Sequence, residues 1–217
     1  MKTVIIRNET PADYPAVEHL TREAFWNQYV PGCSEHYLVH VMRSHPDYIP
    51  QLAFVLELEG RIIGSIHYTR AALIDQTGGE KPVLTFGPVS ILPQFQRKGY
   101  GKRLMEHTFA RAAAMGYEAI VIFGNPDNYV ARGFKACKKH NVCLAPDVFP
   151  ASLLVKELVP GALDGRAWIY RESPVGALCE DARAVDAFDA AFPPKEKGWQ
   201  PSQETFYIYS HPNTCPG

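Results

Sequence analysis

The chain has 217 residues, a formal net charge of −1 at pH 7, and an ordinary balance of 46% hydrophobic and 21% charged residues. This length supports one large domain with a real core, and the composition is typical of globular proteins. Because there is neither a long basic run nor an apolar run of membrane-spanning length, we expect no nucleic acid and no membrane as partner.

The N-terminal part predicts one strand followed by two helices. Residues 3–7 are β-like. Thr10 and Pro11 then have the residue types of a helix N-cap and a first helical position, and apolar residues repeat at helical spacing as far as Phe25. Residues 34–43 predict the second helix. The chain is therefore expected to begin with a β-α-α unit.

A meander of three strands follows. Residues 52–58, 61–74 and 83–91 are rich in β-branched and other apolar residues. Glu59-Gly60 and the Thr-Gly-Gly-Glu of residues 77–80 supply turn signals between them. Because strands joined by short turns pair antiparallel, this segment predicts an antiparallel part of a sheet.

The next segment alternates helices and strands. Residues 102–115 have helical spacing, and residues 119–123 form a short apolar run suited to a central buried strand. Residues 126–132 predict a helical turn, and residues 134–142 and 152–158 predict two more strands. This order predicts an α/β (α+β) fold, with a mixed and mostly antiparallel sheet flanked by helices.

The character of the sequence changes after residue 158. Proline and glycine separate short pieces, with one helix expected over residues 181–192. This part is too short and too broken for a core of its own. We therefore predict a core domain over residues 1–158 and a C-terminal extension over residues 159–217 packed on it. The extension is also a candidate homodimer contact.

The cysteine content argues against a secreted disulfide framework, because five cysteines without a Cys-x-x-Cys pair are an odd and unpatterned set: Cys33, Cys137, Cys143, Cys179 and Cys215. Cys137, His140 and Cys143 suggest metal ligands by proximity alone. On a strand, residues 137 and 143 share one face and residue 140 points to the other, so no metal site is predicted. The N-terminus lacks the pattern of a signal peptide, and we expect a cytoplasmic protein.

The most informative stretch is Gln96-Arg97-Lys98-Gly99-Tyr100-Gly101, between a predicted strand and a predicted helix. A glycine-bearing loop at a helix N-terminus presents backbone N–H groups that have no partner within the helix, and the helix dipole adds positive potential. Such a loop binds anions, most often phosphate. Arg97, Lys98, Lys102 and Arg103 add a local basic cluster.

Two common phosphate motifs do not match this loop. A Walker A loop ending at Gly101-Lys102 would have Gln96 in place of its first glycine and Arg103 in place of its Ser or Thr. A dinucleotide fingerprint fits Gly99 and Gly101 but has Leu104 at its third glycine. What matches is Gln-x-x-Gly-x-Gly between a strand and a long helix.

That pattern resembles the acetyl-CoA pyrophosphate motif of the GNAT superfamily of N-acetyltransferases. Two further stretches agree with the same family: Gly87 to Pro93 resembles the strand before the motif, and Tyr129 to Phe134 resembles its late Tyr-x-x-x-Gly-Phe signature. Phe123-Gly124-Asn125-Pro126 is similar to a bacterial branch of predicted N-acetyltransferases. The resemblance covers roughly residues 1–158.

The resemblance implies acetyl-CoA as cosubstrate. The strand before the loop would hold the pantetheine arm by backbone pairing, and the backbone N–H groups of residues 97–102 would hold the pyrophosphate. The residues that the resemblance assigns to acetyl-CoA are Val89, Ser90, Ile91, Gln96, Arg97, Lys98, Gly99, Tyr100, Gly101, Lys102 and Asn125. No metal is implied.

The implied reaction is direct attack of a primary amine on the thioester, with Tyr129 in the family's general-acid position. Many relatives place a Glu eleven residues before the motif's Gln, and here that residue is Thr85, which cannot act as a base. His67 and Glu57, on neighbouring predicted strands, are candidates that would act through water. The base and the acceptor stay open, and a non-catalytic acyl-CoA sensor module is the alternative function.

In this family the acceptor site is built from the first two helices, the sheet edge and whatever follows the core. Here this means residues 25–45 and the extension, whose aromatic residues Trp168, Tyr170 and Trp199 either line a pocket or anchor the extension.

Overall fold

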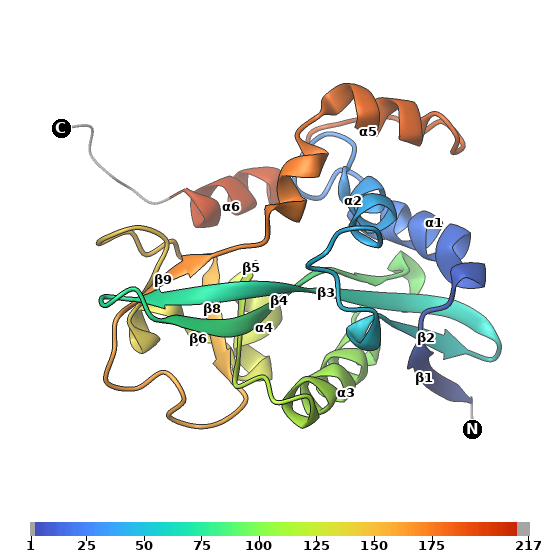
Figure 1. The fold of residues 1–217 in the computed structure, drawn as a ribbon. Coiled ribbons are helices and arrows are strands. Elements are labelled where there is room, and N and C mark those ends of the chain that lie inside the picture. The colour runs from blue at the N-terminus through green and yellow to red at the C-terminus, as the bar shows by residue number, and fades with distance from the viewer. Residues whose placement is uncertain (1–2, 212–217) are drawn as a thin grey trace.

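The computed structural model describes residues 3–211, which form a nine-stranded mixed sheet with helices on both faces (Figure 1). Cys215 lies outside the described residues. The strands are β1 (Val4–Asn8), β2 (Phe54–Leu58), β3 (Arg61–Asp75), β4 (Glu80–Ile91), β5 (Ala119–Phe123), β6 (Lys135–Ala136), β7 (Val142–Cys143), β8 (Leu153–Glu157) and β9 (Trp168–Arg171). The α-helices are α1 (Tyr14–Phe25), α2 (Glu35–Met42), α3 (Tyr100–Ala114), α4 (Pro126–Tyr129), α5 (Ala182–Asp189) and α6 (Pro201–Ser210).

The sheet follows the order β1-β2-β3-β4-β5-β8-β6, and only the β4–β5 pair in this path is parallel. The predicted mixed and mostly antiparallel sheet is therefore confirmed. The two halves of the sheet meet only at one point, because Leu84 and Ile120 are the only paired residues of β4 and β5 among those described. Beyond that point β4 continues to Ile91 beside β3, and within residues 3–211 no strand pairs with its other side.

Helix α3 covers the lower face of the sheet in Figure 1. Met105, Phe109 and Ala112 share one buried face of α3, as the helical spacing predicts, and pack in the main core with Tyr68 and Phe86 from β3 and β4. The core in this region holds α3 against the end of β4, so the loop between them is fixed at both ends.

Helices α1 and α2 cover the opposite face. Val17 of α1 and Val39 of α2 pack on Val55 of β2, and all three side chains are fully buried. A 3-10 turn over Pro11–Asp13 precedes α1, and the backbone N–H of Thr10 donates to Asp13 at 2.8 Å, which confirms a helix start at this sequence signal.

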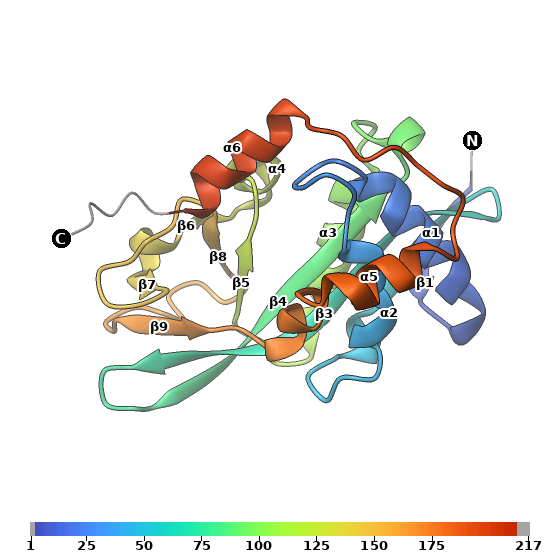
Figure 2. The ribbon, with the colours of Figure 1, turned by 90° about the horizontal axis from the view of Figure 1, so that it is seen from above.

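The extension contributes to the sheet as well as to its cover. β9 pairs with the outer end of β3 and with β7, so Trp168 and Tyr170 are buried between elements of the core, whereas Trp199 is 69% exposed. Figure 2 shows α5 over α2, and α6 beside α4 and β5. The division at residue 158 stays a prediction.

Residues after β9 are attached to the core by partly buried polar contacts. The guanidinium of Arg22 on α1 lies 2.6 Å from Asp189 of α5, and the indole N–H of Trp26 donates to the carbonyl of Glu196 at 2.8 Å. The backbone N–H of Ser152 donates to the carbonyl of Tyr209 on α6 at 3.0 Å. The first two contacts hold the extension to α1, and the third holds α6 to the residue before β8.

The predicted strand over residues 134–142 is wrong. The structure has the two-residue strand β6 there, then a 3-10 helix over Cys137–His140, and a second two-residue strand, β7, that begins at Val142. Asn141 then takes a positive φ of 51°, a conformation that asparagine tolerates better than most residues and that stops an extended strand. The strand argument about Cys137, His140 and Cys143 therefore loses its premise. The thiols of Cys137 and Cys143 donate instead to the carbonyls of Pro150 and Trp168.

Candidate active site

A cavity of about 330 Å³ opens where β4 and β5 separate. Its wall includes Val89 and Ile91 of β4, the loop before α3, and Asn128 and Tyr129 of α4. This volume lies in the range of small-ligand sites. Because β4 has no strand on this side, an extended ligand can lie along it as an added strand.

The loop at one end of the cavity is built to receive an anion. Among the described residues, the backbone N–H groups of residues 97–102 make no hydrogen bond within the protein. Gly99 is the N-cap of α3 with a positive φ of 85°, and the side chain of Gln96 donates to the carbonyl of Ile91 at 3.0 Å, which ties the loop to β4. The free N–H groups therefore lie at the positive end of a fifteen-residue helix.

The two glycines of the loop differ in why glycine is needed. The positive φ of Gly99 strains any other residue. Gly101 has an ordinary φ, and a Cβ there would lie 3.6 Å from Cγ1 of Ile91, an ordinary contact. Both glycines line the cavity. A side chain on Gly101 would therefore occupy ligand space without distorting the backbone.

The basic residues of the loop differ in whether they line the cavity. Arg97 and Lys102 line the cavity, and Lys102 also lies 3.6 Å from Glu106 one turn along α3. Lys98 does not line it; its ammonium donates to the carbonyl of Gln94 at 2.8 Å. Arg132, which follows α4, lines the cavity from the other side, and its Nε is buried without a hydrogen-bond partner.

Tyr129 also lines the cavity, and its side chain is partly exposed. Its ring packs against Phe86 and Phe134, with centroids 5.8 Å apart in both cases. Burial raises the pKa of its hydroxyl above the ordinary value, and the charge of Tyr29 adds to the effect. The hydroxyl is therefore protonated at neutral pH and able to donate a hydrogen bond.

Gly124 makes the position of Tyr129 possible. A Cβ at Gly124 would overlap Cε2 of the Tyr129 ring and lie 2.9 Å from its Cδ2. The backbone N–H of Gly124 donates to Ser152 at 2.9 Å, so this segment is held to β8 and cannot simply move away. The Phe-Gly-Asn-Pro sequence therefore has a steric reason for its glycine.

Three other predicted ligands of acetyl-CoA have side chains directed elsewhere. The buried hydroxyl of Ser90 donates to Thr21 of α1 at 3.2 Å, on the opposite face of β4. The ring of Tyr100 packs against Phe95, and the side chain of Asn125 accepts a hydrogen bond from the backbone N–H of Asp127 at 2.9 Å as the cap of α4.

The candidate bases of the sequence are not at the cavity. Thr85 is buried, and strand alternation puts it on the face of β4 opposite to Phe86 and hence to Tyr129. His67 is fully buried with Nε2 3.2 Å from Glu9, and Glu57 is held by Arg7 at 2.5 Å. Neither His67 nor Glu57 lines the cavity.

Sequence reasoning missed the contribution of α1 and the loop after it. Phe25, Gln28 and Tyr29 line the cavity opposite β4. The ring of Tyr29 lies 4.4 Å from that of Phe206 on α6, so the extension closes over this side of the site. No local motif marks these residues, although they fall within the range 25–45 that the resemblance assigns to the acceptor side.

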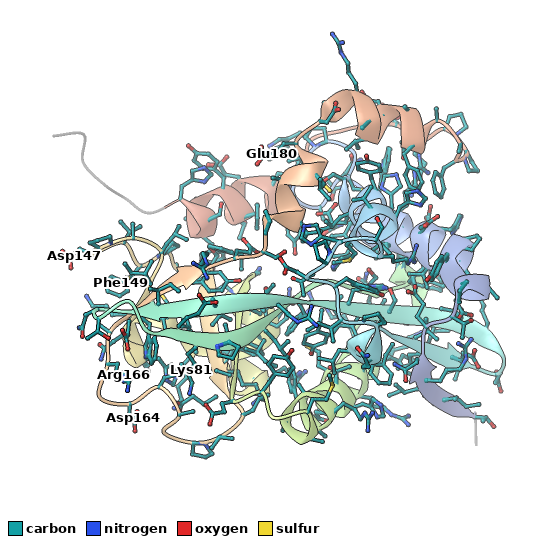
Figure 3. The ribbon with its side chains drawn as sticks, in the orientation of Figure 1. Lys81, Asp147, Phe149, Asp164, Arg166 and Glu180 are labelled. Atoms are coloured by element: carbon teal, nitrogen blue, oxygen red, sulfur yellow. The ribbon has the colours of Figure 1, made fainter. Side chains whose placement is uncertain are left out.

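A larger cavity, of about 520 Å³, lies at the far end of the β3–β4 hairpin and includes Lys81, Asp164 and Arg166, which Figure 3 labels. Lys81 is paired with Glu118, and Arg166 lies 2.8 Å from Asp75. Because these ion pairs neutralise the charges, this cavity is a weaker candidate for binding a charged ligand than the one lined by Tyr129.

Two features are absent from the described residues. Residues 3–211 contain no group of three or more His, Cys, Asp and Glu side chains placed to hold a metal ion. Within the same range, no helix combines the length and the apolar composition that a bilayer crossing requires.

Comparison with known proteins points to one family. The profile of the Acetyltransferase (GNAT) family matches residues 18–136. The uncharacterized N-acetyltransferase YhbS of Escherichia coli K12 is 27% identical over 164 residues, which are 75% of this chain and 92% of that protein.

Two solved structures share the fold. The crystal structure of Escherichia coli YhbS in complex with CoA has a TM-score of 0.70 at 23% identity and covers 82% of this chain and 93% of that one. A GNAT family acetyltransferase from Brucella melitensis in complex with acetyl-CoA has a TM-score of 0.60 at 24% identity, with 80% and 98% covered.

Proposed function

The chain belongs to the acetyltransferase (GNAT) family, and we propose that it transfers the acetyl group of acetyl-CoA to a primary amine by direct attack of the amine on the thioester. The observation that carries this proposal is one cavity whose wall includes both the anion-binding loop and a protonated tyrosine, Tyr129. The CoA and acetyl-CoA complexes of the two structural relatives support the same cosubstrate.

The cavity offers positive charge and an open strand edge, as acetyl-CoA requires. The pantetheine arm lies along Val89 and Ile91 in place of the missing neighbour strand. The pyrophosphate accepts hydrogen bonds from the free N–H groups of residues 97–102, with Arg97 and Lys102 adding positive charge. Arg132 is a further cation on the same wall and has an unused N–H.

The reacting end then lies near Tyr129. A backbone N–H of β4 near Val89 stabilises the oxyanion that forms when the amine attacks. CoA leaves as a thiolate. Full proton transfer from an ordinary tyrosine to a thiolate is uphill by about 2 kcal/mol, and the raised pKa of Tyr129 makes it less favourable still. Tyr129 therefore acts as a hydrogen-bond donor that stabilises the leaving thiolate.

The alternative is an acyl-CoA sensor of the same fold without turnover, which Thr85 in place of the usual glutamate favours. Thiol release separates the two. We expect acetyl-CoA with an amine panel (butylamine, ethanolamine, phenethylamine and spermidine) to release CoA faster than the amine-free blank. Tight acetyl-CoA binding without release for any of these amines, or for amino-acid esters, contradicts the transferase proposal.

The anion loop has its own test in Gly101→Glu. The added carboxylate would meet the pyrophosphate at close range, so we expect acetyl-CoA affinity to fall at least about 100-fold in calorimetry, with the thermal unfolding unchanged. Gly176→Glu is the control, because a Cβ there meets no atom within 4 Å and Gly176 does not line the cavity. Unchanged affinity of Gly101→Glu would show that acetyl-CoA does not use this loop.

A further inference from the structure

We propose that the acceptor is an aromatic primary amine of low basicity, which binds as the neutral free base against Tyr29. The α-amine of an aromatic amino-acid amide has this chemistry. The proposal rests on the proposed transferase function and names the class of acceptor for the same cavity.

The wall of the cavity opposite β4 is aromatic. Phe25 ends α1, Tyr29 lies on the loop that follows, and both line the cavity. The ring centroid of Tyr29 lies 5.8 Å from that of Phe25 and 4.4 Å from that of Phe206 on α6. All three side chains are only partly buried, so some of this aromatic surface is open to a ligand. An aromatic ring on the acceptor can pack against it.

The free polar side chains of the cavity wall include four neutral ones. Tyr29, Tyr129, Gln28 and Asn128 line the cavity, and their side chains make no hydrogen bond to another described residue. A hydroxyl or amide oxygen accepts a hydrogen bond from the N–H of a neutral amine. The charge of Tyr29 raises the pKa of Tyr129, after the larger effect of burial, so the two hydroxyls are near one another. An amine held by Tyr29 is therefore close to the hydroxyl that stabilises the leaving thiolate.

The surroundings of Tyr29 disfavour a charged amine. Burial raises the pKa of the Tyr29 hydroxyl to about 12, and the charge of Glu35 adds to this effect. The same loss of solvation lowers the pKa of a bound ammonium group. The charged residues of the wall, Arg97, Lys102 and Arg132, are cations that match the phosphates of acetyl-CoA and do not attract an ammonium group. The neutral form of the acceptor is therefore the form that fits.

Low basicity supplies enough of this neutral form. An α-amine with a pKa of about 7.7–8.0 is about one-tenth neutral at pH 7, whereas a lysine-like amine with a pKa of about 10.4 is neutral in only about one molecule in 2,500. His67 and Glu57 do not line the cavity and cannot make up this difference. Glu35 does not line it either, although burial raises the pKa of its carboxyl to about 7. An amine of low basicity needs no side-chain base.

The step balances without a proton acceptor on the protein. The nitrogen lone pair of the neutral amine forms the C–N bond, and the C–S electron pair leaves with the sulfur. The nitrogen loses one proton to water, and the thiolate, stabilised by the hydroxyl of Tyr129, gains one proton from water. The products are the amide and the CoA thiol, with no net uptake or release of protons.

The first test uses four amines in which the aromatic ring and the basicity vary separately. Phenylalaninamide has the ring and low basicity, alaninamide has only low basicity, phenethylamine has only the ring, and butylamine has neither. The kcat/KM of each is measured from pH 6 to pH 9.5 at saturating acetyl-CoA. At pH 7 we expect phenylalaninamide to exceed each of the others at least about tenfold. Its kcat/KM should level off above about pH 8, whereas that of phenethylamine should still rise at pH 9.5, because the limb follows the pKa of the amine itself.

The second test examines Tyr29 by the ratio of kcat/KM for phenylalaninamide to that for alaninamide. We expect Tyr29→Leu to lower this ratio at least about fivefold, because the ring is lost. Tyr29→Phe should keep the ratio within about twofold while lowering both values at least about threefold, because only the hydroxyl is lost. Tyr207→Leu is the control at an exposed tyrosine of α6 that does not line the cavity, and it should match the wild type. A purely structural role of Tyr29 would lower both values together and leave the ratio unchanged.

The outcomes separate this proposal from the transferase function. If all four amines share one limb near pH 7, a group of the protein accepts the proton and binding as the free base is wrong. If another of the four amines matches phenylalaninamide at pH 7, or Tyr29→Leu leaves the ratio unchanged, the acceptor class is wrong and the transferase function stands. If the wild type turns over no amine, the transferase proposal fails and the acceptor class fails with it.

Discussion

Replacing Glu35 with glutamine should stabilise the folded protein, and this stability effect can be measured without any substrate. Burial raises the pKa of Glu35 from 4.5 to about 7, so the folded protein binds the proton more tightly than the unfolded chain does. The stability that Glu35 contributes is therefore present below pH 4.5 and is lost as the pH rises toward 7. The shift corresponds to about 3 kcal/mol, as an upper value because the side chain is partly exposed.

The assay is thermal or urea unfolding of the wild type, Glu35→Gln and Glu180→Gln at pH 5 and pH 8. Glutamine resembles the protonated carboxyl, so we expect Glu35→Gln to exceed the wild type by up to about 3 kcal/mol at pH 8, or roughly 6–12 °C in Tm, and by under about 1 kcal/mol at pH 5. Glu180→Gln should change neither value by more than about 0.5 kcal/mol, because this side chain is exposed.

Two results would refute this reasoning. Equal stability of Glu35→Gln and the wild type at pH 8 would mean that the Glu35 carboxylate is well solvated. A gain of the same size at both pH values would mean that the effect comes from packing and not from ionisation. A gain at pH 8 that is much smaller at pH 5 identifies a carboxylate whose ionisation destabilises the folded protein.

Three further predictions concern neighbouring groups. Tyr129→Phe should lower kcat at least about tenfold with acetyl-CoA affinity within twofold, and unaltered turnover would remove the hydroxyl from the mechanism. Gly124→Ala should displace the Tyr129 ring, which should lower kcat and lower the free energy of unfolding in urea by about 1–3 kcal/mol. Wild-type values of both quantities would contradict the overlap. Burial alone would raise the pKa of Glu9, but hydrogen bonds from His67 and Arg43 lower it to about 2. Glu9→Gln should therefore lower the free energy of unfolding by about 3–5 kcal/mol at pH 7, and by less as the pH falls from 4.5 toward 2. A loss of the same size at every pH would argue against the ion pairs.

Local sequence signals were sufficient for the anion loop and its surroundings. The glycines, the proline before them and the helical spacing after them act within a few residues, and the structure has β4, the loop and α3 in that order. Tyr129 was accessible for the same reason, since it follows a short apolar strand within one turn. The fold class followed from the order of these local elements.

The parts that depend on distant pairing were not accessible in this way. β9 is held by β3, more than 90 residues earlier, as in the pair of Asp75 and Trp168, and no short-range pattern encodes that partner. The strand predicted around Cys137 failed because Asn141 prefers a left-handed turn over continued extension. Glu35 carries no motif, and burial in the folded chain, not any local pattern, raises the pKa of its carboxyl.

If acetyl-CoA binds along β4 as proposed, the separation of β4 and β5 would make it a structural component of the protein as well as a reagent. Between Leu84 and Ile91, no strand among the described residues pairs with the open edge of β4. The pantetheine arm would supply the missing hydrogen bonds there. The free energy of binding then adds directly to the free energy of unfolding, by about 2.7 kcal/mol at a concentration 100 times Kd. The folded protein would thus be more stable at higher concentrations of its own cosubstrate.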